Sequence, residues 1–165
     1  MRVVVAVLFV GMMFGGQTTA ADGTDPRVRS SNPAIVAALA EAASRSATFR
    51  SLVEKIEETD GIVYIERGRC RHGVAACLSL LVHSGGGYRL LRILVDGVDN
   101  LASLVATMAH ELRHALELLS EPAVRTTAAA YNFYLREAPT SRDVFETDAA
   151  IQAGLQVERE FLRQR

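Results

Sequence analysis

The chain has 165 residues, 49% of them hydrophobic and 22% charged, with a formal net charge of −1 at pH 7. This length and composition indicate one folded domain with its own core and exclude a disordered chain. The near-neutral charge gives no overall attraction for nucleic acid, so we expect no nucleic-acid partner. One local cluster of arginines is predicted to form a solvent-exposed hairpin face rather than a ligand patch: Arg67, Arg69, Arg71, Arg89 and Arg92.

The first twenty residues differ in kind from the rest of the chain. Arg2 is followed by the twelve-residue apolar run VVVAVLFVGMMF and then by small and polar residues up to Ala20 and Ala21. This order is typical of a secretory signal peptide, here 1–20, with cleavage after Ala20 or Ala21. A bilayer span needs about 20 apolar residues, so we expect no stable membrane anchor. The chain is therefore predicted to be secreted or periplasmic.

After processing, residues 21–31 are predicted to be a flexible arm and residues 32–165 to be the folded domain. Export changes the interpretation of the two cysteines, Cys70 and Cys77. In an oxidising compartment two cysteines this close in sequence are expected to form a disulfide. The alternative is a second metal site made by Cys70, His72 and Cys77, which lacks a fourth ligand and the usual close cysteine spacing.

Two helices and three strands are predicted before residue 100. The first helix has Asn32 as its N-cap and Pro33 as its first residue and ends near Ser44, and the second covers 46–61. The strands are predicted at 62–66, 75–83 and 88–95, with a glycine-rich turn at 84–87. We expect these strands to form a small antiparallel sheet.

Three helices are predicted to complete the chain. Asn100 caps the first, which covers 101–119. The second begins at Pro122 and stops before Pro139, and the third opens near Ser141 and continues through the sequence FETDAAIQAGLQVEREFL. The sequence therefore predicts an α+β fold in which a three-stranded antiparallel sheet packs under helices.

The most informative stretch is MAHELRHALELL, on the helix predicted at 101–119. His110 and His114 are four residues apart, so their Cβ atoms lie about 6 Å apart on one helix face. Both imidazoles can then reach a single Zn²⁺ at about 2.1 Å. Glu111 points about a quarter-turn away, where it can contact a water molecule on the metal and act as a base. The alternative is two exposed histidines beside a solvated glutamate.

A catalytic zinc needs a third protein ligand, and no third histidine follows soon after this motif. Glu117 lies one turn too far along the same helix, so we expect it to be a hydrogen-bond partner of His114. Glu146 is the preferred third ligand, on a last helix whose small residues, such as Ala150, permit close approach to another helix. Asp148 and Glu117 remain as alternatives.

His110, Glu111 and His114 make the H-E-x-x-H motif of zincin metalloproteases. With the run from Glu146 to Ala149, which is similar to a Glu-x-x-Ala sequence, the chain resembles the gluzincin branch of zincins. The resemblance implies that His110, His114 and Glu146 bind zinc and that Glu111 is the catalytic base. It also implies a zinc metallopeptidase acting outside the cytoplasm on peptide or protein substrates, which would add along a sheet edge.

Many gluzincins carry an aspartate after that alanine to orient a ligand histidine, whereas this chain has Ala150. The resemblance therefore leaves the orienting group undetermined. Tyr88, Arg113, Tyr131 and Tyr134 are candidates to stabilise an oxyanion, although packing or surface roles are expected for each. The alternative function is an exported, non-catalytic helical binding or structural protein in which the motif is incidental or inactive.

Overall fold

The computed structural model describes residues 25–97, 100–137 and 145–163. The predicted signal peptide and the first residues of the predicted arm lie outside these ranges. Within them, no helix has the length and apolar character needed to span a bilayer.

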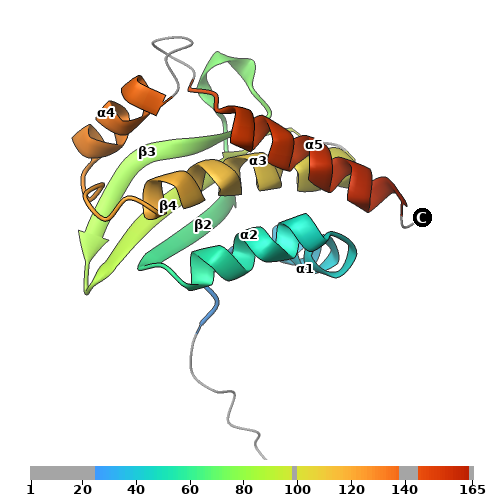
Figure 1. Cartoon of the computed structure of the whole chain (residues 1–165). Helices are drawn as coiled ribbons and strands as arrows, with labels where there is room; N and C mark the ends of the chain where they lie inside the picture. The colour runs from blue at the N-terminus through green and yellow to red at the C-terminus, as the bar shows by residue number, and fades with distance from the viewer. Residues whose placement is uncertain (1–24, 98–99, 138–144, 164–165) are drawn as a thin grey trace, which may run out of the picture.

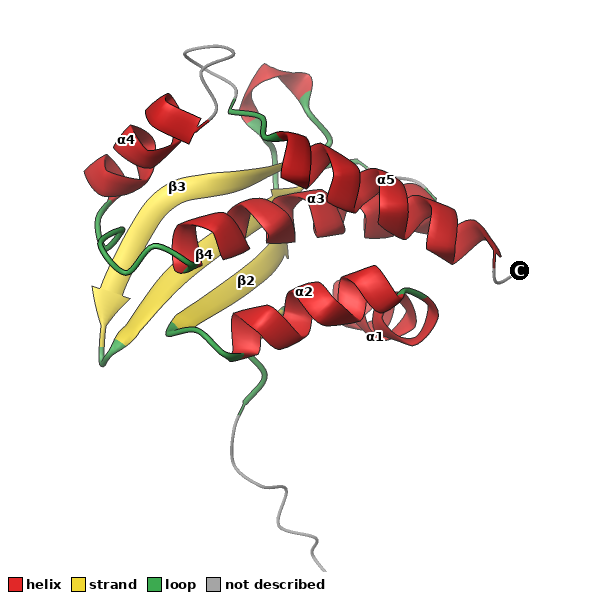
Figure 2. Ribbon diagram, in the orientation of Figure 1, coloured by secondary structure: helices red, strands yellow, loops and turns green. Residues whose placement is uncertain are grey.

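The described part of the chain has an α+β fold, which confirms the predicted class (Figures 1 and 2). Its elements in chain order are β1 (Val28–Arg29), α1 (Pro33–Arg45), α2 (Ala47–Glu57), β2 (Gly61–Arg67), the 3-10 turn η1 (Arg71–Gly73), β3 (Ala76–Gly85), β4 (Tyr88–Val95), α3 (Leu101–Leu119), α4 (Thr127–Glu137) and α5 (Asp148–Arg163).

The sheet is mixed and has four strands, so the prediction of a three-stranded antiparallel sheet was wrong. Its spatial order is β1-β2-β4-β3. Only the β3–β4 hairpin is antiparallel, whereas β4 pairs in parallel with β2 and β2 pairs in parallel with β1. The chain leaves β2, passes through η1 and forms β3 at the outer edge, so the returning β4 fills the position next to β2. Local hairpin signals do not encode this crossover.

Strand β1 lies in the segment predicted to be a flexible arm. Val28 pairs with Val63 of β2 and is buried. The Val63 N–H donates to the Arg27 carbonyl at 2.7 Å, and the Arg27 N–H donates to Glu57 Oε1 at 2.7 Å. Residues 27–29 are therefore attached to the domain, because one apolar side chain in a polar segment reaches the core.

The helices α2 and α3 pack against one face of the sheet, and α5 packs on α3 (Figure 1). Alternate residues of β4, among them Leu91 and Ile93, are buried toward these helices. Helix α3 lies between the sheet and α5, and Gly154 of α5 allows the close approach. A Cβ atom at Gly154 would lie 3.2 Å from the Ala106 carbonyl oxygen and 3.4 Å from His110 Cβ. The small residues predicted to let two helices approach closely thus bring α5 against the histidine-bearing turn of α3.

The predicted N-caps are confirmed for two helices. Asn32 caps α1 and Asn100 caps α3 through their side-chain oxygens. Two other starts were wrong, because α4 begins at Thr127 rather than Pro122 and α5 begins after residue 147 rather than near Ser141. Residues 138–144 lie outside the described ranges. At α5 the Ala150 N–H donates to Thr147 Oγ1 at 3.1 Å, so Thr147 ends the preceding loop and begins the helix.

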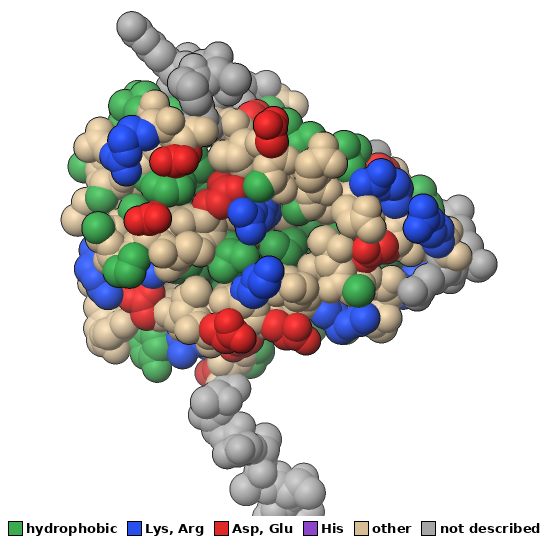
Figure 3. Space-filling view, in the orientation of Figure 1, with side chains coloured by type: hydrophobic (Ala, Val, Ile, Leu, Met, Phe, Trp, Pro, Cys, Tyr) green, Lys and Arg blue, Asp and Glu red, His purple; other side chains and the backbone are tan. Residues whose placement is uncertain are grey.

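Two further expectations concern the β2–β4 region. The disulfide between Cys70 and Cys77 is confirmed, with their Cα atoms 5.9 Å apart, so the alternative metal site that used both thiols is wrong. Four arginines of the predicted exposed cluster are exposed, but Arg89 is only 2% exposed and belongs to the core. On the face seen in Figure 3, acidic and basic side chains of the described residues are interspersed.

Helix α5 also contacts the start of α2 through Glu160. Its carboxylate accepts hydrogen bonds from Ser46 Oγ at 2.6 Å, from the Thr48 N–H at 3.0 Å and from Thr48 Oγ1 at 2.8 Å. Burial opposes ionisation, but the hydrogen bonds from Ser46, Gln156 and Thr48 outweigh it and lower the pKa of Glu160 to about 2. The negative charge also lies at the positive end of the α2 dipole.

We expect the Glu160→Gln variant to be about 1–2 kcal/mol less stable than the unmodified chain at pH 7, because the pKa is depressed but solvent screens the charge of this partly exposed side chain. A carboxyl group with a depressed pKa contributes stability above its unfolded-state pKa, near 4.5. This contribution is lost as the pH falls toward 2. Denaturant unfolding between pH 7 and pH 2.5 should therefore show the two proteins converging at low pH. Glu158→Gln removes one charge from the same helix and serves as the control; a constant difference across this pH range would contradict the assignment.

Candidate metal centre

His110, His114 and Glu146 come together in the structure. The two histidines lie on successive turns of α3, and Glu146 lies in the segment just before α5. Glu146 Oε2 is 3.1 Å from His110 Nε2 and 3.9 Å from His114 Nε2. One ligand atom from each of the three residues lies within 4.8 Å of the others. This group can hold a metal ion.

The backbone position of Glu146 differs from the prediction. Glu146 was expected on the last helix, but it precedes the Thr147 cap, so its carboxylate reaches α3 from a loop end. The two alternative ligands are not part of the group of three. Asp148 is exposed on the first turn of α5, and Glu117 contacts His114 from the side away from the shared metal-ligating atoms.

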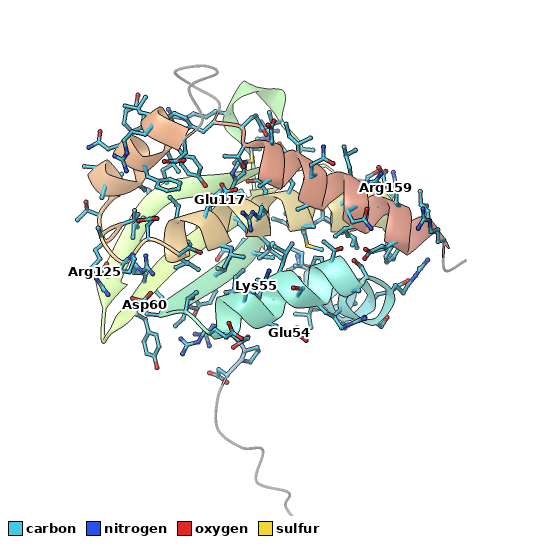
Figure 4. The ribbon with its side chains drawn as sticks, in the orientation of Figure 1. Glu54, Lys55, Asp60, Glu117, Arg125 and Arg159 are labelled. Atoms are coloured by element: carbon cyan, nitrogen blue, oxygen red, sulfur yellow. A yellow bond between two sulfur atoms is a disulfide. The ribbon has the colours of Figure 1, made fainter. Side chains whose placement is uncertain are left out.

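The predicted contact between Glu117 and His114 is present. Glu117 Oε2 lies 3.2 Å from His114 Nδ1. A carboxylate can only accept a hydrogen bond, so the ring donates its Nδ1–H and keeps Nε2 toward Glu146. The other oxygen of Glu117 accepts from Thr147 Oγ1 at 2.8 Å and lies 3.3 Å from Arg113 Nε. Figure 4 labels Glu117 on α3. Glu117 thus contacts the ring nitrogen of His114 that faces away from Glu146.

Two buried polar atoms of the group indicate whether a metal ion fits between the three residues. His114 Nε2 and Glu146 Oε2 are both buried, and among the described residues neither has a hydrogen bond of good geometry, although Glu146 Oε2 lies 3.1 Å from His110 Nε2. Buried polar atoms are normally hydrogen-bonded, and leaving one without a partner costs about 1–3 kcal/mol. Two histidines and one glutamate are also a known donor set of catalytic zinc sites, with the fourth position left open. The residues therefore fit a metal ion.

The ionisable groups of the site have perturbed pKa values. Burial raises the pKa of Glu111 to about 7. Burial and the neighbouring His114 lower the pKa of His110. Burial also disfavours a charge on His114, but its contacts with Glu117 and Glu146 outweigh this and raise its pKa to about 9. The histidine rings in turn lower the pKa of Glu146, and His114 and Thr147 lower that of Glu117.

Glu111 is buried between α3 and the sheet, with 7% of its surface exposed. Its Oε2 accepts a hydrogen bond from the Leu78 N–H of edge strand β3 at 2.6 Å. His114 is also buried, at 5% exposure. The alternative of two exposed histidines beside a solvated glutamate was therefore wrong. The sequence gives no sign of the Leu78 contact, since 33 residues separate the partners.

The oxyanion candidates have other contacts. Tyr134 is 2% exposed and donates from its hydroxyl to the His114 carbonyl at 2.8 Å. Its ring also lies edge-to-face with the His114 ring, so Tyr134 packs beneath the site. Tyr131 and Tyr88 are exposed, and the Arg27 guanidinium lies over the Tyr88 ring. These tyrosine contacts agree with the packing and surface roles expected from the sequence.

An open pocket of about 320 Å³ lies beside the group. His110, Glu111 and Glu146 line one part of it. Much of the remaining wall is apolar and comes from the end of the disulfide-closed loop and from α5, including Val74, Ile151 and Leu155. These three side chains are exposed despite being apolar, so the pocket offers hydrophobic surface next to ionisable groups.

Comparison of the chain with protein families, curated proteins and solved structures finds no match. An assignment of function therefore rests on the residues and the geometry of the site.

Proposed function

We propose that this chain is a zinc-dependent peptidase in which His110, His114 and Glu146 bind the metal and Glu111 is the general base. The observation that carries the proposal is the convergence of three ligand atoms within 4.8 Å, with His114 Nε2 and Glu146 Oε2 buried and without a well-formed hydrogen bond to any described residue. The disulfide is compatible with the extracellular location predicted from the first twenty residues.

A zinc ion held by His110, His114 and Glu146 would lower the pKa of a bound water molecule toward about 7 and would polarise a substrate carbonyl. Glu111 would be placed to take a proton from this water because it lines the same pocket as His110 and Glu146. Its Oε2 is engaged by the Leu78 N–H, so we assign proton transfer to Oε1. Once the water oxygen has bonded to the carbonyl carbon and the C–N bond breaks, the same carboxyl group would deliver its proton to the leaving amine.

The pocket suggests which peptides fit. Its wall carries Val74, Ile151 and Leu155, all exposed and apolar, within reach of His110 and Glu111. An aliphatic side chain bound there would remove apolar surface from water at about 25 cal/mol per Å². We therefore infer peptide substrates with an aliphatic residue next to the cleaved bond.

The metal site is tested by zinc affinity in matched variants. The purified chain should bind about one zinc per molecule, because a catalytic site holds one ion with three protein ligands. Removal of a hydrogen-bond partner of a ligand typically costs about 10–100-fold in metal affinity, so Glu146→Ala, which removes a ligand, should cost more than about 100-fold. Asp148→Ala, two residues away, should change the affinity less than about 2-fold because Asp148 is exposed and outside the group.

Elemental analysis of the purified chain measures the number of zinc ions bound per molecule. Competition with a chromogenic chelator measures the zinc affinity of each variant. A larger loss in Asp148→Ala than in Glu146→Ala would move the third ligand to Asp148. A chain that binds no zinc at all would favour the non-catalytic binding or structural protein.

A further inference from the structure

Thr147 occupies the junction between the loop that carries Glu146 and helix α5. Its Oγ1 accepts a hydrogen bond from the Ala150 N–H at 3.1 Å, which is the ordinary function of a helix N-cap. The same hydroxyl donates to Glu117 Oε1 on α3 at 2.8 Å. Capping needs only the first contact. The second contact ties the start of α5 to the helix that carries both histidines.

Glu117 connects this hydroxyl to the metal group. Its side chain is 11% exposed and uses one oxygen for Thr147 and the other for His114 Nδ1, at 3.2 Å. Both carboxylate oxygens are therefore engaged, so the Glu117 side chain has one preferred orientation. Partners of this kind fix the ring orientation and the tautomer of a metal-binding histidine.

We propose that Thr147 is a positioning residue for the metal centre and acts through Glu117. With Thr147 in place, Glu117 holds the His114 ring with Nε2 directed toward Glu146, the residue adjacent to Thr147 in sequence. The Thr147 hydroxyl thus fixes the position of His114 on α3 relative to Glu146, which precedes α5. The inference rests on the zinc site proposed above and adds a residue that the sequence analysis did not single out.

A double-mutant cycle on zinc affinity tests this inference. Valine has the shape of threonine but neither donates nor accepts, so Thr147→Val should weaken zinc binding about 10-fold. Thr147→Ser keeps the hydroxyl and should bind within about 2-fold of the unmodified chain. In a Glu117→Ala background, Thr147→Val should weaken binding less than about 2-fold further, because the partner through which it acts is gone. An equal loss in both backgrounds would reduce Thr147 to a helix cap and overturn the proposal.

A second readout needs no metal and separates failure of this inference from failure of the proposed function. The Nδ1–H proton of His114, observed by NMR, should exchange with water more slowly in the unmodified chain and in Thr147→Ser than in Thr147→Val. Equal exchange in all three proteins would overturn the positioning role even if zinc binds. If zinc does not bind but the exchange rates differ as expected, the contact chain stands and the peptidase assignment fails.

Discussion

Glu111→Gln should retain zinc and lose peptide cleavage. Glutamine has nearly the same shape, and its side-chain oxygen can still accept from the Leu78 N–H, but it cannot take a proton from water. General-base catalysis contributes about 10²–10⁴-fold, so we expect cleavage to fall by that factor. This corresponds to about 3–5 kcal/mol in the activation free energy. The rate of cleavage can be measured by mass spectrometry on peptides that carry aliphatic residues at the cleavage site.

A matched control is available in the same pocket. Glu158 also lines it, and Glu158→Gln removes one carboxylate charge without touching the group of three ligands. This control should cleave within a few-fold of the unmodified chain. Cleavage that is lost on zinc removal and returns on its addition would confirm that the activity belongs to the metal site. Unchanged cleavage in Glu111→Gln would assign the proton transfer to another group.

The helices and strands that were predicted correctly are marked by short sequence features, such as helix caps and turns. Asn32 and Asn100 supply side-chain oxygens at helix starts, and the run of residues 88–95 follows a glycine-rich turn. Each of these features acts within a few residues, so it can be recognised from the sequence. The predicted start near Ser141 was wrong, although Thr147 carries such a signal six residues later.

The features that the sequence did not predict depend on contacts between segments that are distant in sequence. The order of β2, β3 and β4 depends on which strand fills the centre of the sheet, and short-range alternation does not determine this. The pairing of Val28 with Val63 joins a residue before α1 to a residue after α2. The contact between Glu111 and Leu78 likewise requires β3 to lie beside α3.

The candidate site was more predictable than the sheet. The spacing of His110 and His114 fixes their common face on any helix, so the fold was not needed to pair them. Glu146 was predicted to lie on the last helix. That helix starts two residues after Glu146, yet the Glu146 carboxylate still reaches His110. A residue just before the N-cap and a residue in the first turn can point toward the same neighbouring helix. The role of Thr147 required the structure, because its partner Glu117 lies 30 residues away.

The largest loss of stability is expected at Arg89, on the strand beneath α3. Its guanidinium, 3% exposed, donates through Nε to Asp60 Oδ1 at 2.7 Å and pairs with the same carboxylate through Nη2. It also donates to the Leu118 carbonyl at 3.0 Å and to the Leu119 carbonyl at 2.6 Å, in the last turn of α3, where carbonyls have no partner further along the helix. The positive charge suits the negative end of the helix dipole. Asp60 also accepts from Arg125 at 2.9 Å (Figure 4).

Arg89→Met should therefore reduce the free energy of unfolding by about 3–5 kcal/mol, since it leaves Asp60 and the α3 carbonyls without their buried partner. Arg92→Met is the matched control on the same strand. Arg92 pairs with Glu66 at the surface, where its side chain is 56% exposed, so its loss should cost less than about 1 kcal/mol. Denaturant unfolding of both variants measures the difference. Equal, small losses would show that the end of the histidine-bearing helix is held by apolar packing alone; the expected large difference would show that one buried cation attaches that helix to the sheet.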